Sequence, residues 1–182
     1  MAATASLPQS SQLAIDRAAL SAGVPKDYLW IPRAIAYGES GGNPYAVGDG
    51  GHSIGLFQLH DRGAGYGMSV EERQDSAKNA AKIMPGIAGS INRYAGMGLS
   101  GADLLKAVWY EALRPQKSPE TDARMDAAYS ATGGGVEGER PLPLDPDTDE
   151  VDGDEVGEFW GDGGGGGGEK KQKLTPYQGY VV

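Results

Sequence analysis

Glu39 is the residue of this sequence that is best placed to do chemistry. An apolar pattern with helical spacing precedes it over residues 28–36, and the glycine pair Gly41-Gly42 follows it. The pattern predicts a carboxylate at the end of a packed helix, held between apolar side chains and a backbone-rich loop. Partial removal from water favours the protonated carboxyl, which suits a general acid. The alternative is an ordinary solvated glutamate at a helix end.

The elements that position Glu39 are predicted to be helices. Each has apolar residues at helical spacing, bounded by a capping residue, a glycine or a proline. The predicted helices span about residues 10–22, 25–39, 69–74, 75–95, 100–113 and 118–132. Pro32 and Pro85 lie inside two of these helices and remove backbone donors. We therefore expect a kink or break near Ile31, and a kinked or bipartite helix over about residues 75–95.

Two motifs that include and follow Glu39 resemble a known family. They are Glu39-Ser40-Gly41-Gly42-Asn43-Pro44, with Ala46-Val47 after it, and Gly55-Leu56-Phe57-Gln58-Leu59. In this order they resemble the signature of the lytic transglycosylase SLT family, relatives of goose-type lysozyme. Gln58 lies 19 positions after Glu39, one more than the family pattern, and the glycine-rich residues 48–51 can absorb the extra residue.

A later helix carries a partial match to the same family. Ala107, Tyr110 and Ala112 fit the family pattern, whereas Glu111 and Leu113 replace the usual Asn and Gly. The cleft wall that this helix would form is therefore expected to differ from that of the family.

The resemblance implies an all-α, lysozyme-like domain that cleaves the β-1,4 bond between N-acetylmuramic acid and N-acetylglucosamine in peptidoglycan glycan strands. It implies Glu39 as the catalytic acid, a short helix at residues 55–58 on the cleft floor, and no cofactor. The residues that it implies for substrate binding are Ser40, Asn43, Phe57, Gln58 and Tyr110, with Tyr110 reaching Glu39. Phe57 is also explained as a core residue, and Gln58 as a loop amide bonded to the backbone.

Two reactions remain open for such a site. One carboxylate suffices for transglycosylation, in which the muramic 6-hydroxyl closes on the anomeric carbon to form a 1,6-anhydro sugar. Inverting hydrolysis needs a second carboxylate about 6.5–9.5 Å from the first. The nearby carboxylates are Asp49, Asp61 and Glu111, and each is also explained as a solvated residue of a loop or helix face. The resemblance favours the transglycosylase, with a goose-type muramidase as the alternative.

Composition argues against several other classes of protein, such as disulfide-rich, metal-binding, nucleic-acid-binding and membrane-spanning proteins. The chain of 182 residues has 39% apolar residues and no cysteine, so we expect one packed core without disulfide or thiol chemistry. His52 and His60 are few and isolated in sequence, which favours loop histidines near the cleft over a metal site. The net charge of −9 and the lack of a basic stripe oppose nucleic-acid binding, and no apolar run is long enough for a membrane span.

The composition changes after Gly135. Residues 136–182 hold 12 acidic and 4 basic side chains and so carry eight of the nine net negative charges. Charge repulsion, prolines and a glycine run predict a tail without a core, so we expect residues 1–135 to form a domain that folds alone. Apolar groups in the tail, such as Phe159-Trp160, are typical of a segment that binds a partner.

The first residues lack the charged and apolar regions of a secretory signal. A peptidoglycan enzyme without such a signal has to reach the wall inside another particle, through a partner or after lysis. We therefore expect synthesis in a host cytoplasm and carriage in a phage virion, with virion or tail proteins as partners of residues 136–182. A structural virion protein with an inactive lysozyme-like domain is the remaining alternative.

Overall fold

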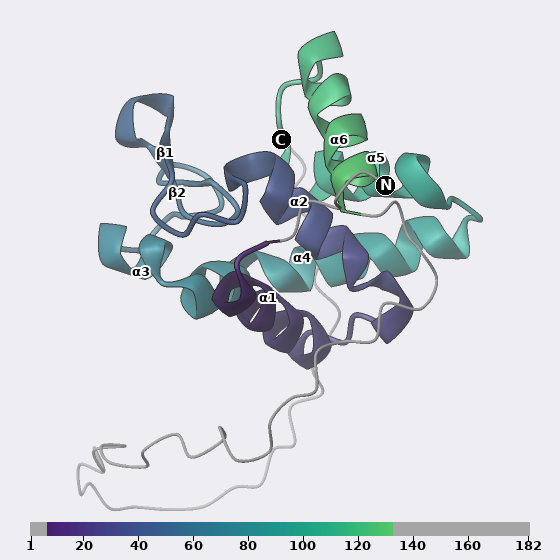
Figure 1. The fold of residues 1–182 in the computed structure, drawn as a ribbon, viewed down its shortest axis with the longest axis horizontal. Helices are drawn as coiled ribbons and strands as arrows, with labels where there is room; N and C mark the ends of the chain where they lie inside the picture. The colour runs from purple at the N-terminus through teal and green to yellow at the C-terminus, as the bar shows by residue number, and fades with distance from the viewer. Residues whose placement is uncertain (1–6, 133–182) are drawn as a thin grey trace, which may run out of the picture. The chain divides into compact units, whose positions relative to one another are not determined.

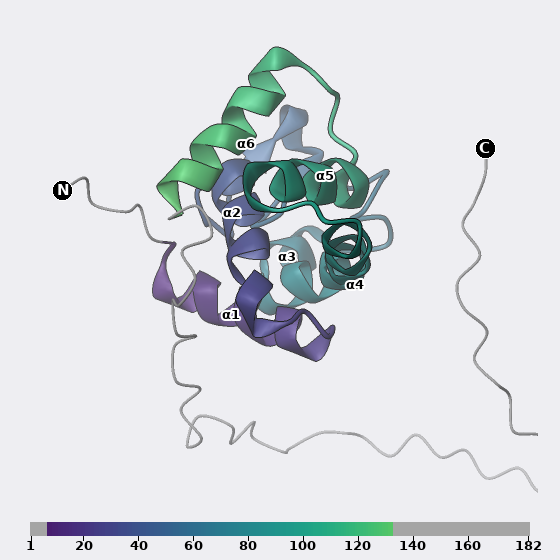
Figure 2. The same cartoon turned by 90° about the vertical axis from the view of Figure 1, so that its right-hand side faces the viewer.

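The computed structural model describes residues 7–132, which form six α-helices and a small antiparallel sheet (Figures 1 and 2). The helices are α1 (Gln9–Ser21), α2 (Trp30–Ser40), α3 (Val70–Gln74), α4 (Ser76–Gly96), α5 (Gly101–Leu113) and α6 (Pro119–Ala131). The mainly helical prediction is confirmed. The predicted boundary at residue 135 and the tail 136–182 lie outside the described residues, so both stay predictions.

α2 is the helix that carries Glu39, and three other helices hold it. It packs against α1, α5 and α6, and Figure 2 shows α6 lying across it. Arg33 of α2 donates two hydrogen bonds to Asp16 of α1, from Nε at 2.8 Å and Nη2 at 2.7 Å. Both side chains are buried, so the planar bidentate pair fixes the orientation of α2 against α1 as well as satisfying two charges.

Both ends of α2 follow from local sequence. The predicted break near Ile31 is confirmed, because a short 3₁₀ turn at Lys26–Tyr28 precedes α2 and Pro32 lies in its first turn, where a missing amide costs least. At the other end, Gly41 has a φ of 64°, a left-handed conformation that glycine adopts without steric cost. Glu39 therefore lies in the last turn of α2.

Of the two forms expected for residues 75–95, the bipartite helix is wrong. α4 runs as one helix from Ser76 to Gly96 and contains Pro85. Pro85 lies on the exposed side, whereas Ile83, Met84, Ile87 and Ile91 are buried against the core. The continuous apolar face holds the helix together, and water can satisfy the carbonyl that the proline leaves without a donor.

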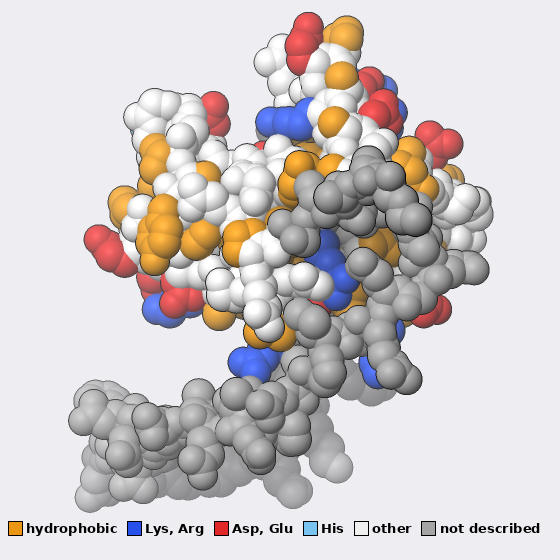
Figure 3. All heavy atoms as spheres, in the orientation of Figure 1, with side chains coloured by type: hydrophobic (Ala, Val, Ile, Leu, Met, Phe, Trp, Pro, Cys, Tyr) orange, Lys and Arg blue, Asp and Glu red, His pale blue; other side chains and the backbone are white. Residues whose placement is uncertain are grey.

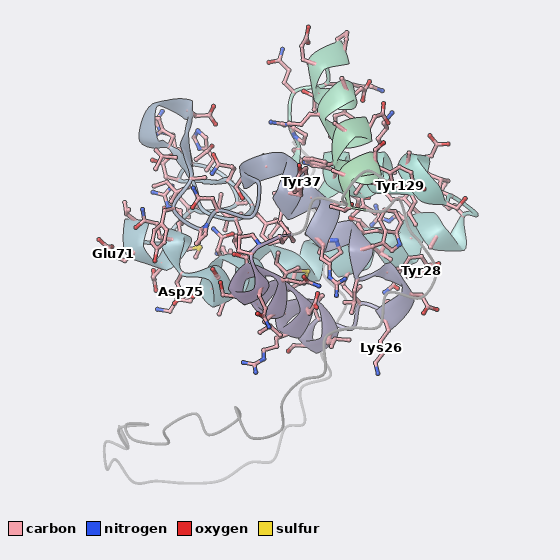
Figure 4. The ribbon with its side chains drawn as sticks, in the orientation of Figure 1. Lys26, Tyr28, Tyr37, Glu71, Asp75 and Tyr129 are labelled. Carbon is pink, nitrogen blue, oxygen red and sulfur yellow. The ribbon has the colours of Figure 1, made fainter. Side chains whose placement is uncertain are left out.

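Capping residues set the beginnings of α3 and α4. The spacing of Ser69 and Glu72 in the sequence indicates a capping box, and the structure forms it: Glu72 N donates to Ser69 Oγ, and Ser69 N donates to Glu72 Oε2. Asp75 then caps α4 by accepting from Lys78 N at 2.9 Å. Figure 4 labels Glu71 and Asp75 near this junction.

The short helix implied at residues 55–58 is absent from the described fold. A hairpin turn occupies these positions and joins β2 (Ser53–Ile54) to β3 (Leu59–His60), while β1 (Val47–Gly48) pairs with the other edge of β2. The buried Asn79 of α4 holds the turn: its Oδ1 accepts from Phe57 N at 3.1 Å, and its Nδ2 donates to Ile54 O. These bonds satisfy turn groups that a helix would have paired internally.

The core lies between the helices and under the hairpin. The largest fully buried side chains are Ile15, Ile31, Ile35, Leu56, Phe57, Leu59, Met84, Ile87, Ile91, Leu104, Leu105 and Trp109. At its edge, the rings of Trp30 and Tyr129 meet edge-on at 5.6 Å and join α2 to α6; Figure 4 labels Tyr129 there. Among the helices of residues 7–132, none combines the length and apolar character that a bilayer span requires.

Candidate active site

A cleft of about 600 Å³ opens beside the C-terminal end of α2. One wall comes from the hairpin region and the other from the end of α5, the loop after it and α6. The lining residues are Glu39, Gly48, Asp49, Ser53, Phe57, Gln58, His60, Gly63, Ala64, Leu113, Arg114, Pro115, Gln116 and Arg124. Figure 3 shows the surface hollowed between the hairpin and α6, with cationic side chains on the α6 side.

Glu39 lies in this cleft with a side chain that is only 10% exposed. Trp109 Nε1 donates to Glu39 Oε1 at 2.5 Å, and Arg124 Nη2 lies 3.7 Å from the same oxygen. The Arg124 guanidinium also lies over the Trp109 ring, 5.7 Å from its centroid. Gly38 makes this arrangement possible, because a Cβ there would meet Trp109 Cη2 at 2.0 Å.

The surroundings raise the pKa of Glu39 above its ordinary value. Burial is the largest cause, since it penalises the charged carboxylate. Arg124 and the Trp109 hydrogen bond act in the opposite direction, and the negative charge of Asp49 adds to the rise. The site therefore favours a protonated carboxyl and still supplies a donor and a cation that stabilise its anion, as a general acid requires.

Two substitutions should move the pKa of Glu39 in opposite directions. Arg124→Gln removes a cation that lowers this pKa and should raise it further, whereas Asp49→Asn removes an anion that raises it and should lower it. The measurement is an NMR titration of the Glu39 side-chain carboxyl. Lys82→Gln, at an exposed position of α4, is the control for net charge. Shifts of the same sign in both variants, or an equal shift in the control, would contradict this electrostatic account.

Comparison with known families gives a match over part of the chain. Residues 16–88, from α1 to the middle of α4, match the family model of a lysozyme-like domain. The chain contains a lysozyme-like domain. The match supports the predicted relation to lysozyme-like and SLT proteins and indicates an activity on peptidoglycan. No curated protein and no solved structure matches the chain.

The lysozyme-like domain separates the three candidate second carboxylates. Asp49 lines the cleft with Glu39 and accepts a hydrogen bond from Ser53 Oγ. Glu111 instead pairs with Arg93 of α4, at 2.5 Å. Asp61 pairs with His52, whose hydrogen bond lowers the pKa of the Asp61 carboxyl. Neither Asp61 nor Glu111 lines the cleft, so Asp49 is the carboxylate that the fold brings to Glu39.

The residues implied for substrate binding fall into two groups. Phe57 and Gln58 line the cleft, although Phe57 is otherwise buried and Gln58 Nε2 donates to the carbonyls of Ala46 and Gly55. Phe57 is therefore a core residue as well as a cleft residue, and Gln58 is a loop amide bonded to the backbone as well as a cleft residue.

Ser40 and Asn43 are outside the cleft lining. Ser40 Oγ donates to Leu56 O at 2.9 Å and so ties α2 to the hairpin turn. Asn43 Oδ1 accepts from Tyr45 N at 2.9 Å and closes a local turn. In this structure both side chains shape the loop that follows Glu39.

The expectation that Tyr110 reaches Glu39 is wrong. The Tyr110 hydroxyl donates to Asp122 of α6 at 2.7 Å, and this bond raises its pKa to about 12. The neighbouring Trp109 is the α5 side chain that contacts Glu39. A one-residue change on a helix rotates a side chain by about 100°, so the partial motif identified the correct helix and the wrong residue.

The two histidines are not isolated in the fold. His52 immediately precedes β2 and His60 is the last residue of β3, and their rings stack with 5.5 Å between centroids. One ligand atom from each of His52, His60 and Asp61 lies within 4.8 Å of the others. Hydrogen bonds already use several of these atoms: His52 Nδ1 bonds Asp61 Oδ2, and His60 Nδ1 accepts from Arg62 N. The β2–β3 hairpin was not predicted from the sequence, and the register of this hairpin places positions 52 and 61 opposite each other. Prediction of the hairpin would have brought the two histidines together.

Proposed function

We propose that this protein cleaves the β-1,4 bond between N-acetylmuramic acid and N-acetylglucosamine by lytic transglycosylation. The observation that carries the proposal is the carboxyl of Glu39, which is desolvated in an open cleft and contacted by an indole donor and a guanidinium. Such a group favours its protonated form more than an exposed glutamate does, and it can give the proton to a leaving oxygen.

The reaction needs two proton transfers at Glu39. The protonated carboxyl donates to the glycosidic oxygen as the bond to the anomeric carbon breaks. The resulting carboxylate, stabilised by Trp109 and Arg124, then accepts the proton of the muramic 6-hydroxyl while that oxygen bonds to the anomeric carbon. Glu39 ends protonated, and the product is a 1,6-anhydro sugar without addition of water.

A goose-type muramidase is the second candidate, and the position of Asp49 favours it. Asp49 shares the cleft with Glu39, and the hydrogen bond from Ser53 helps to orient its carboxylate. A carboxylate so placed could activate water for hydrolysis. The same residue could also orient the sugar in the transglycosylase. The chemical ends of the released muropeptides therefore distinguish hydrolysis from transglycosylation.

We predict that digestion of purified peptidoglycan releases muropeptides that end in 1,6-anhydro sugars. Asp49→Asn should keep this product, with a loss of turnover well below the roughly 100-fold expected for removal of a catalytic base. Mass spectrometry separates anhydro from reducing ends, because the latter contain one additional water. Reducing ends in the parent, together with a loss of about 100-fold or more in Asp49→Asn, would establish hydrolysis instead.

We also propose that the enzyme is carried in a phage virion and opens the wall during genome entry. The acidic composition of residues 136–182, interrupted by apolar groups, supports this role as a tether to virion or tail proteins. An inactive structural protein is the alternative, and any release of muropeptides by the purified chain would exclude it.

A further inference from the structure

Backbone strain is concentrated in the cleft. Within residues 7–132, the non-glycine residues with positive φ are Asp49 at 48°, Gln58 at 46° and Arg114 at 49°. All three line the cleft. The left-handed region costs free energy for residues with a Cβ, and proteins keep such residues mainly where the side chain is needed.

Arg114 differs from the other two in having no partner that explains its side chain. Asp49 accepts from Ser53, and the amide of Gln58 donates to backbone carbonyls. Arg114 forms the C-cap of α5, where its backbone N donates to Tyr110 O, a task that glycine performs without strain. Its side chain makes no ion pair or hydrogen bond to another residue of 7–132.

The charge of the cleft is asymmetric around Glu39. The hairpin wall contributes the anion of Asp49, whereas the α5–α6 wall contributes Arg114 and Arg124. Arg124 is already placed against Glu39 and Trp109, so Arg114 is the cation left for a ligand. It is exposed, and its guanidinium suits a carboxylate, which it can bind through two parallel hydrogen bonds.

We propose that Arg114 determines specificity by binding a carboxylate of the muramyl residue. The inference rests on the proposed function, because it takes the glycan strand as the ligand. In that strand the N-acetylglucosamine units are neutral, whereas each muramyl unit carries an acidic substituent. The carboxylate has two sources: the lactyl group itself in strands without peptides, or the stem peptide that is joined to the lactyl group. A cation in the cleft that holds Glu39 would then set which of the alternating bonds is presented to the acid.

The test is binding of soluble glycan fragments, measured by calorimetry in the Glu39→Gln background so that no turnover is required. Three fragments separate the sources: strands with stem peptides, strands without peptides, and peptide-free strands whose lactyl carboxylates have been converted to amides. In this background, the Arg114→Gln protein should bind at least one acidic fragment about tenfold more weakly than the protein that retains Arg114. Both proteins should bind the amidated strand with the same affinity. Lys82→Gln controls for net charge, and Arg114→Gly removes the side chain while relieving the backbone strain.

The outcomes assign or overturn the role of Arg114. A loss with peptide-free strands assigns the lactyl carboxylate, and a loss confined to peptide-bearing strands assigns the stem peptide. Arg114→Gly should show the same loss with an unchanged or higher melting temperature, which excludes unfolding as the cause. Equal affinity in the parent and Arg114→Gln, or an equal loss with the amidated strand, overturns the role and leaves the proposed function standing. If the Glu39→Gln protein that retains Arg114 binds none of the fragments, the proposed function fails as well.

Discussion

Glu39→Gln is expected to reduce muropeptide release by about 10²–10⁴-fold, the usual contribution of a general acid. The amide keeps an oxygen that can accept from Trp109 Nε1 but has no acidic proton to donate. The fold should persist, because the buried site already disfavours the charged carboxylate and a neutral amide relieves that cost. Release is measured by chromatography of soluble products, and folding by circular dichroism and thermal unfolding.

Glu71→Gln is a matched control for this substitution. Glu71 is an exposed glutamate in the first turn of α3, so the same chemical change there should leave turnover near that of the parent. A Glu39→Gln protein that clears peptidoglycan at nearly the parental rate would show that another group supplies the proton. Loss of activity together with loss of helical signal would point to a folding defect.

Gly38→Ala is expected to destabilise the domain by about 1–3 kcal/mol, the usual cost of overpacking a core. The added Cβ would lie 2.0 Å from Cη2 and 2.9 Å from Cζ2 and Cζ3 of Trp109, which is fully buried. The indole has to move, and its hydrogen bond to Glu39 moves with it, so activity should fall with stability. Chemical denaturation gives the free energy of unfolding, and muropeptide release gives the activity.

Gly89→Ala separates this steric effect from helix propensity. Gly89 is an exposed glycine inside α4, and a Cβ there would meet nothing within 4 Å. Alanine should stabilise the helix at that position by up to about 1 kcal/mol. Equal stabilisation by both alanines would mean that the indole does not occupy the space beside Gly38.

Local sequence was sufficient to predict the elements whose signals lie close together. The left-handed Gly41, the Ser69 capping box and the apolar face that leads to Glu39 each involve residues within one or two turns of a helix. Local sequence left open whether α4 continues through Pro85, because burial of its apolar face has to outweigh the local cost of a missing donor. Tertiary packing decided that case.

The chemical surroundings of Glu39 were less predictable for the same reason. Trp109 is 70 positions away in sequence, and Arg124 lies on a still later helix whose orientation no local pattern specifies. Among the three candidate second carboxylates, Glu111 pairs with Arg93 and Asp61 pairs with His52, and neither lines the cleft. Those pairings depend on packing between α4 and α5 and on hairpin register, neither of which a single sequence reports.

The long separation between Glu39 and Trp109 also bears on how the protein becomes active during synthesis. Long-range contacts form only after the loop between them has closed, which makes them slower to form than contacts within a helix. A nascent chain that ends before α5 has a Glu39 without its indole donor, without Arg124 and without one wall of the cleft. Catalytic competence is therefore tied to completion of the last helices, so partly made chains in the producing cell lack the assembled site.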